Sequence, residues 1–245
     1  MPKKIRSLLR SLVPLVSILF VLSEVTGDDF IHFISEDIHH MFSRKPLLIA
    51  GIGGAVTAGA FLLESREGYE GFVGEGCLRN CSEVCDRAFG LPLIGASSIM
   101  WAGGAIIGSS DTEETGQMLT EGLLLTYGLT GAMKIASGRA RPDGSDSHSF
   151  PSGHSSGTAC AAVILWDTYG PGAGIPAAAI ATFTALSRIS LGKHYPSDVV
   201  AGAAIGLSVG LAVAAAHEDD GGSDHHIQPT LGIRWSSSEG FGVYF

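Results

Sequence analysis

Long apolar blocks separated by short polar segments fill the middle of the chain, and this pattern predicts helices. Six apolar helices are expected, each as long as a bilayer-crossing segment or slightly shorter, over 47–63, 91–108, 117–137, 155–168, 172–187 and 198–216. Connections such as residues 169–174 are very short, as antiparallel neighbours in a bundle require. The sequence therefore predicts an all-α fold built on six helices.

Two other segments flank the first apolar helix in the sequence. Residues 29–43 have apolar positions four apart and predict an amphipathic helix. Residues 64–86 are polar and are expected to form a loop, which carries three of the cysteines. The four cysteines of the chain are Cys77, Cys81, Cys85 and Cys160. The C-x3-C-x3-C spacing does not match common zinc sites, so we expect a disulfide there if the chain is exported, with the pairing left open.

The composition supports apolar helices but does not decide whether they lie in a membrane or in a protein core. Hydrophobic residues make up 45% of the chain and charged residues only 16%, so much of it must be buried in protein or lipid. Glycine and alanine carry much of the apolar character, and Glu121 and Asp167 interrupt two of the helices. Six membrane spans and a compact bundle with an apolar core both fit, and we favour membrane association. The net charge of −9 disfavours nucleic acid as a partner.

The first 27 residues have the pattern of an export signal. Basic residues between Lys3 and Arg10 precede an apolar core over 12–22, and small residues follow at Ser23 and Gly27. An uncleaved anchor helix is the alternative. Both interpretations place the rest of the chain across a membrane, in the periplasm or cell envelope.

The C-terminal region changes character. Residues 219–226 form a polar linker, and residues 227–235 and 240–245 alternate in polarity around a short turn. This alternation predicts a β-hairpin. A small ribbon packed on the helices is favoured over a barrel strand, because unpaired strand edges are not tolerated in lipid. Residues 219–245 are therefore assigned to a linker and hairpin whose role stays open.

Three short motifs carry the candidate chemistry, and the first two bind anions by different means. Lys134 and Arg141 are seven residues apart, which on one helix is nearly the same face, and Pro142 would end that helix. Ser152 is a natural N-cap for the apolar helix that follows, and a helix N-terminus is a ready anion site. Gly153 lets the main chain approach a bound group, and His154 lies in the first turn beside it.

The third motif pairs a histidine with a carboxylate. His194 and Asp198 are four residues apart, so Asp198 can bind one imidazole nitrogen and leave the other as a lone pair for nucleophilic attack. Arg188 adds a third cation. A metal site made of His154, His194 and Asp198 is disfavoured, because three neighbouring cations would repel a divalent ion.

These residues resemble the type 2 phosphatidic acid phosphatase and vanadium haloperoxidase superfamily, whose signature is K-x6-R-P, then P-S-G-H, then S-R-x5-H-x3-D. The chain matches every position, at Lys134, Arg141, Pro142, Pro151, Ser152, Gly153, His154, Ser187, Arg188, His194 and Asp198. The resemblance implies a six-helix bundle of the acid phosphatase and haloperoxidase type. Its motif core is 134–198, the helix layout extends the likeness over about 90–216, and the helical phosphatase domain is assigned to residues 28–218.

The resemblance also implies phosphatase chemistry without a metal or other cofactor. His194 would form a phosphohistidine, Asp198 would orient it, and His154 would protonate the leaving oxygen. The phosphoryl oxygens would be held by Lys134, Arg141, Ser152, Gly153 and Arg188. We therefore expect hydrolysis of a phosphate monoester or diphosphate, with a lipid as the favoured substrate and the oligomeric state open. The alternatives are a vanadate-dependent haloperoxidase and a non-enzymatic cell-envelope protein.

Overall fold

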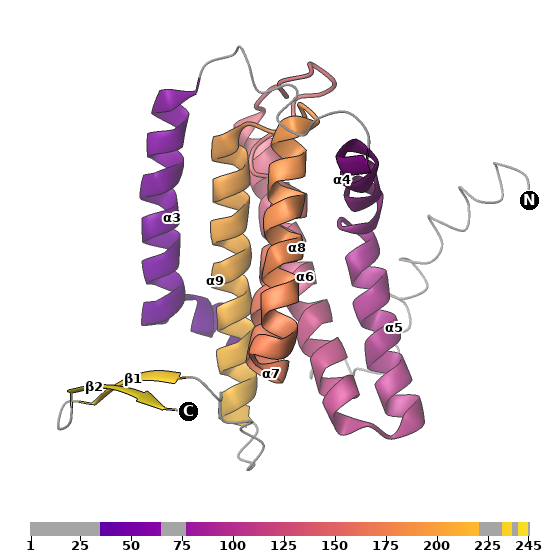
Figure 1. Ribbon diagram of the computed structural model, residues 1–245, viewed down its shortest axis with the longest axis vertical. Helices are drawn as coiled ribbons and strands as arrows, with labels where there is room; N and C mark the ends of the chain where they lie inside the picture. The colour runs from indigo at the N-terminus through magenta and orange to yellow at the C-terminus, as the bar shows by residue number, and fades with distance from the viewer. Residues whose placement is uncertain (1–34, 65–76, 221–231, 237–239, 245) are drawn as a thin grey trace, which may run out of the picture.

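A computed structural model describes residues 35–64, 77–220, 232–236 and 240–244 (Figure 1). The predicted signal peptide or anchor over 1–27 and most of the predicted linker lie outside these residues. The helices are α3 (Arg44–Leu63), α4 (Cys77–Ala88), α5 (Pro92–Ile107), α6 (Ser110–Ser137), α7 (Gly153–Tyr169), α8 (Pro171–Ser190) and α9 (Pro196–Asp220). Residues 35–41 add a short helix inside the predicted amphipathic segment 29–43. The predicted helical fold is confirmed.

Helix α4 corrects the predicted count of six helices, because it occupies part of the segment 64–86 that was predicted to be a loop. Its inner face contains Ser82 and Cys85, both buried, while Val84 is exposed. A helix whose buried positions hold small polar or sulfur-bearing residues lacks the Leu, Ile and Phe periodicity by which helices are recognised in a sequence. Cys85 and Cys160 form no disulfide, and a disulfide involving Cys77, whose side chain is outside the described part, stays a prediction.

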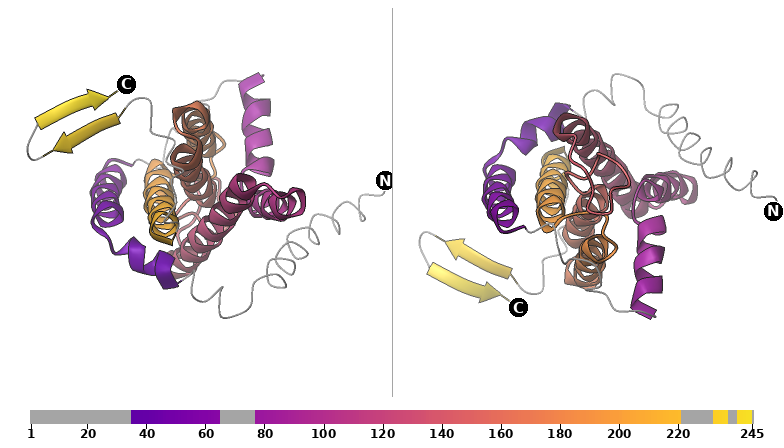
Figure 2. Two further views of the ribbon diagram at one scale, coloured as in Figure 1. Left: turned by 90° about the horizontal axis from the view of Figure 1, so that it is seen from below. Right: turned by 90° about the horizontal axis from the view of Figure 1, so that it is seen from above.

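The long helices run side by side, with α7 and α9 packed together at the centre (Figure 1). Views along the bundle show α3 beside α9 and α5 beside α6 at the periphery, whereas α4 runs across the bundle axis (Figure 2). A cluster of buried apolar residues joins α6, α7 and α9, and it comprises Met118, Leu119, Cys160, Ile164, Val209, Val213 and Ala214. Most of the bundle is therefore organised around α9.

Glycines spaced four apart allow α9 to approach the backbone of α7. A Cβ atom added at Gly202 would clash with the carbonyl oxygen of Ser152, and one at Gly206 would clash with that of Ser156. Close approach of this kind is what small residues in apolar helices permit. It brings the first residues of the two helices together, and the Ser152 N–H donates to the Asp198 carbonyl at 2.9 Å. The second and third motifs are thereby fixed at the same end of the bundle.

Apolar side chains also cover outer surfaces. Three described helices are long and apolar enough to cross a membrane, at Arg44–Leu63, Pro171–Ser190 and Pro196–Glu218, and Pro92–Ile107 is a shorter apolar helix. Helix α3 has little of its surface buried, and Leu48 and Leu62 are among its exposed side chains. Exposed apolar surface of this extent favours a lipid environment, so the structure supports membrane association.

Two short strands follow the helical part. Strand β1 (Gly232–Ser236) pairs with β2 (Gly240–Tyr244) in antiparallel register, with Gly232 opposite Tyr244. The packing of this segment on the helices and its role stay predictions.

Candidate active site

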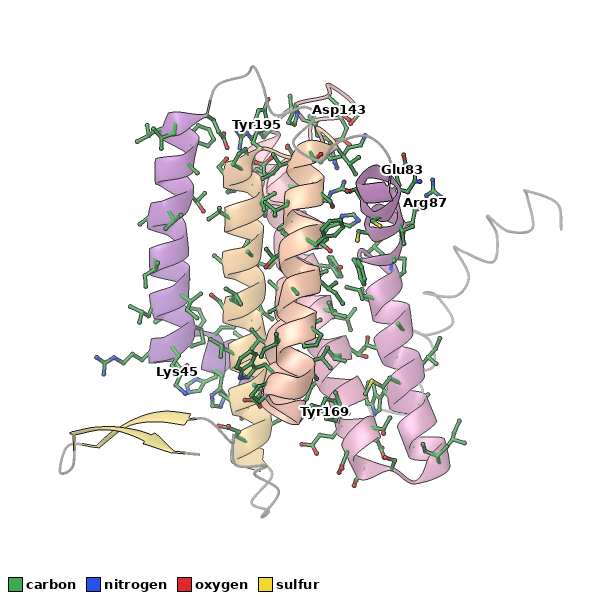
Figure 3. The ribbon with its side chains drawn as sticks, in the orientation of Figure 1. Lys45, Glu83, Arg87, Asp143, Tyr169 and Tyr195 are labelled. Carbon is green, nitrogen blue, oxygen red and sulfur yellow. The ribbon has the colours of Figure 1, made fainter. Side chains whose placement is uncertain are left out.

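The three sequence motifs meet at one end of the bundle, where α6 and α8 end and α7 and α9 begin. Asp143 and Tyr195 mark this end in the view with side chains (Figure 3). The loop between α6 and α7 lies against the loop between α8 and α9, because the Asp143 N–H donates to the Gly192 carbonyl at 3.1 Å and Lys193 Nζ donates to Asp143 Oδ2 at 2.6 Å. Residues separated by about 50 positions thus share one small region.

The end of α8 determines where His194 lies. Gly192 adopts a φ of +63°, a conformation that glycine reaches without steric cost. The chain reverses there, so that the Arg188 carbonyl accepts the N–H groups of both Lys193, at 3.0 Å, and His194, at 3.2 Å. This turn ties His194 to the last turn of α8. The His194 side chain is only 2% exposed.

Asp198 lies in the first turn of α9 and is held from several directions. Its Oδ2 accepts the Tyr195 N–H at 2.9 Å and the Ser149 hydroxyl, and its Oδ1 accepts Nη1 of Arg139. His194 Nδ1 lies 3.6 Å from Oδ2, slightly beyond hydrogen-bond length. The predicted pairing of His194 with Asp198 is present as a close contact, and it turns the opposite ring nitrogen, Nε2, away from the carboxylate.

The three predicted cations reach this region from different segments. Lys134 is in the last turn of α6 and donates to the His148 carbonyl at 2.7 Å. Arg188 is in the last turn of α8 and is 3% exposed. Arg141 donates from Nε to Asp146 at 2.8 Å and from Nη1 to the Lys193 carbonyl at 3.4 Å.

The expected placement of Lys134 and Arg141 on one helix is wrong. Helix α6 ends at Ser137, because Gly138 takes a left-handed conformation with φ +52° and its N–H donates to the Lys134 carbonyl. A left-handed glycine just beyond the last turn is a common helix terminator. Arg141 therefore approaches from the loop.

The three cations act on the pKa of His194. The pKa of His194 is lowered to about 4, mainly by burial; the contact with Asp198 raises it, whereas Lys134, Arg188 and Arg141 each lower it. The imidazole is consequently neutral at neutral pH, with a lone pair on one nitrogen. Neutrality is what an attacking histidine needs.

The second motif forms the start of α7. Ser152 is the N-cap, and its hydroxyl oxygen accepts the Ser155 N–H at 3.4 Å. A Cβ on Gly153 would lie 4.0 Å from Cε of Lys134, so this backbone segment borders the cationic region. His154 is in the first turn and its ring faces Gly90, where an added Cβ would come within 3.1 Å of Nε2.

Three further residues contact these side chains and were not predicted, and a fourth binds one of the three. Arg139 and Ser149 bind Asp198, Glu64 binds Arg139, and Gly90 packs on His154. Arg139 lies between Lys134 and Arg141 in the sequence, and this position in the first motif could have identified it as a candidate site residue. No sequence pattern pointed to Glu64, because it lies in a segment that was predicted to be a loop. In the described part of the chain no three His, Cys, Asp or Glu side chains group as metal ligands, and metal independence stays a prediction.

Fold and motifs together define an all-helical protein with a histidine among cations at one end of its bundle. Residues 118–221 match the sequence profile of the PAP2 superfamily. The match includes all three motifs and is to the superfamily that they resemble.

Two similar proteins of known activity share part of this region. Lipid A 1-phosphatase of Porphyromonas gingivalis is 39% identical over 101 residues, which cover 39% of this chain and 23% of that protein. Decaprenylphosphoryl-5-phosphoribose phosphatase of Mycobacterium tuberculosis is 46% identical over 66 residues, which cover 26% of this chain and 35% of that protein. The matched regions are thus well under half of either relative.

The fold is also that of a solved structure. The crystal structure of a transmembrane PAP2-type phosphatidylglycerolphosphate phosphatase from Bacillus subtilis superimposes with a TM-score of 0.51, covering 78% of this chain and 94% of that one at 23% identity. This likeness concerns the fold alone.

Proposed function

We propose that the protein is a metal-independent phosphatase that hydrolyses a phosphate monoester or diphosphate of a lipid through a phosphohistidine on His194. One observation carries the proposal: the buried imidazole of His194 has its Nδ1 3.6 Å from Asp198, and three cations lower its pKa. A neutral nucleophile among positive charges suits attack on a phosphoryl group, whose transition state is stabilised mainly by positioning and charge.

The reaction would proceed in two displacements. Nε2 of His194 attacks phosphorus and forms a P–N bond while the bond to the leaving oxygen breaks, and His154 gives its proton to that oxygen. A water molecule then attacks the phosphohistidine, His154 accepts a proton from this water, and the P–N bond breaks to release phosphate. Asp198 would hold the Nδ1 proton and stabilise the charge on the imidazole in the intermediate.

The phosphoryl oxygens would be held by Lys134, Arg141 and Arg188, together with Ser152 and the Gly153 N–H at the start of α7. The first turn of a helix offers unsatisfied N–H groups and a partial positive charge to an anion. These donors would neutralise the oxygens in the ground state and even more in the transition state.

A lipid substrate is supported by two independent features. Three described helices have the length and composition of membrane spans, and the candidate site lies at one end of two of them, α8 and α9. The two relatives are named lipid A 1-phosphatase and decaprenylphosphoryl-5-phosphoribose phosphatase. Export to the periplasm or cell envelope is part of the proposal, on the pattern of the first 27 residues.

The proposal is tested by measuring phosphate release from the purified full-length protein in detergent micelles with EDTA present. The panel pairs dioleoyl phosphatidate and an isoprenyl diphosphate with a sugar phosphate and p-nitrophenyl phosphate. We expect faster release from the lipids, which EDTA leaves unchanged. Faster release from all soluble esters would remove the lipid substrate, and bromide oxidation with vanadate and peroxide in place of phosphate release would make the protein a haloperoxidase.

A further inference from the structure

Arg139, which the three motifs do not include, lies beside the histidine–carboxylate pair. Its guanidinium carbon lies over two rings, 4.6 Å from the centre of Phe61 and 4.1 Å from the centre of Tyr195. The side chain is 18% exposed. Guanidinium groups stack in this way when their plane must be held in one orientation.

Both terminal nitrogens of Arg139 donate to protein groups. Nη1 donates to the Ser197 hydroxyl at 2.7 Å and to Asp198 Oδ1, and Nη2 donates to Glu64 Oε2. Glu64 in turn accepts the Ser197 N–H on Oε1 at 2.7 Å. The four groups therefore close a network in which Glu64 fixes Arg139 and the backbone at the start of α9.

In this network the two oxygens of the Asp198 carboxylate contact different groups. Oδ2 is the oxygen beside His194 Nδ1, while Oδ1 is the oxygen bound by Arg139. A carboxylate in the first turn of a helix can rotate about its side-chain bonds unless both oxygens are held. The contact on Oδ1 therefore fixes the carboxylate together with the Tyr195 N–H and the Ser149 hydroxyl on Oδ2, and it is Oδ2 that faces the His194 ring.

We propose that Arg139, held by Glu64, is a positioning residue that aims His194 through Asp198. This inference rests on the proposed function. Arg139 is not assigned to the phosphoryl group, because both its Nη atoms already donate to protein groups, Ser197, Asp198 and Glu64. Its loss should therefore affect the chemical step more than substrate binding.

The test compares Arg139→Ala, Arg139→Lys and Glu64→Gln with Arg87→Ala in the full-length protein in detergent micelles. Arg87 is the matched control, an ion-paired arginine on α4 that is 75% exposed and lies 3.6 Å from Glu83. We expect Arg139→Ala to lower kcat about 100-fold, since a misplacement of about 1 Å can cost that much. KM should stay within about threefold of the wild-type value, because uniform substrate binding is retained.

The two conservative variants separate positioning from charge. Lysine keeps the charge but lacks the planar fork whose two nitrogens bind Ser197, Asp198 and Glu64, so Arg139→Lys should restore only part of kcat. Glu64→Gln keeps the shape and should cause a smaller loss than Arg139→Ala. The Arg87→Ala variant should match the wild type in kcat and KM.

A second readout does not depend on turnover. In protein carrying ring-15N histidine, the His194 resonances, assigned by their absence in His194→Asn, should show one tautomer with the proton on Nδ1. Arg139→Lys should show a mixture of tautomers or a shifted Nδ1 resonance. Arg87→Ala should give the wild-type spectrum.

The outcomes distinguish this inference from the proposed function. An active wild-type enzyme with wild-type kcat and His194 resonances in both Arg139→Lys and Glu64→Gln would overturn the positioning role alone. A higher KM at unchanged kcat in the Arg139 variants would overturn it too, because Arg139 would then bind substrate. Wild-type protein that releases no phosphate from any substrate would overturn the proposed function, whereas the tautomer measurement would still decide whether Arg139 orients His194.

Discussion

Two histidine–carboxylate pairs lie at opposite ends of the same helix. At the start of α9, His194 Nδ1 lies 3.6 Å from Asp198, and in its last turn His217 Nε2 lies 3.0 Å from Glu121. Both carboxylates are buried, and the second contact is the shorter. About 20 residues of helix, or roughly 30 Å, separate the two histidines.

The surroundings of the two pairs differ in sign of charge. Lys134, Arg141 and Arg188 surround His194, whereas the acidic side chains Asp37 and Glu114 act on His217 together with Glu121. Acidic surroundings favour a protonated histidine and repel a phosphate, while cationic surroundings favour a neutral histidine and attract one. A histidine next to a carboxylate is therefore not by itself a catalytic feature, and the neighbouring charges decide what the pair can do.

The largest expected contrast is between the same substitution at the two histidines. His194→Asn should lower kcat by at least about a thousandfold, since removal of a nucleophile leaves only the background from the remaining site. His217→Asn should leave kcat unchanged and lower the thermal midpoint, because a buried Glu121 with a poorer partner costs about 1–3 kcal/mol. Phosphate release and thermal unfolding by circular dichroism measure the two effects. Equal loss of activity in both variants would remove the distinction between the two ends.

Removal of one cation should have the next largest effect. Arg188→Ala takes a buried charge from beside His194 and should lower kcat/KM about 100-fold or more, as the loss of one transition-state donor does. Arg87→Ala on α4 is the control and should match the wild type. Initial rates at low substrate concentration measure both. Near-normal kcat/KM in Arg188→Ala would mean that the cations do not act on the phosphoryl group.

A smaller effect is expected from Gly90→Ala, because the new methyl group would press on the His154 ring, 3.1 Å from Nε2. If His154 protonates the leaving oxygen, kcat should fall about tenfold for phosphatidate, a fraction of what general acid catalysis contributes. The loss should be smaller for p-nitrophenyl phosphate, whose leaving group needs little protonation. Gly103→Ala, where an added Cβ meets nothing within 4 Å, is the control. Equal losses on both substrates would contradict the role of His154.

The smallest effect is a shift in pH dependence. Because burial and the cations lower the pKa of His194 to about 4 from 6.5, its protonation should reduce kcat/KM only as the pH falls toward 4. Between pH 4 and 6.5 the unfolded chain binds more protons at this residue than the folded chain, so its contribution to folding stability decreases as the pH falls. His194→Asn should flatten the stability curve in that window. An acid limb centred near pH 6.5 in the wild type would contradict the neutral nucleophile.

Local spacing explains what was predictable from the sequence. The Ser152 cap, the Pro196 start of α9 and the proximity of His194 to Asp198 all depend on residues within a few positions of one another. The six apolar stretches have counterparts in α3 and α5 to α9, because apolar length alone defines such helices.

Non-local contacts explain what was missed. Glu64 is 133 residues from Ser197 in the sequence, and no pattern in either segment predicts their contact. The end of α6 depended on the conformation of one glycine, Gly138, which a chain with 34 glycines does not single out. Arg141 nevertheless joins the cationic region, because its Nη1 donates to the Lys193 carbonyl at 3.4 Å.

The phosphohistidine is tested most directly by trapping it. Wild-type protein, His194→Asn and His217→Asn would be mixed with a 32P-labelled substrate in EDTA, quenched within milliseconds and digested. Label that is stable in base, labile in acid and located on the peptide containing His194 is expected in the wild type and in His217→Asn, with none in His194→Asn. Acid-stable label, or label that persists in His194→Asn, would contradict the assignment of His194 as the nucleophile.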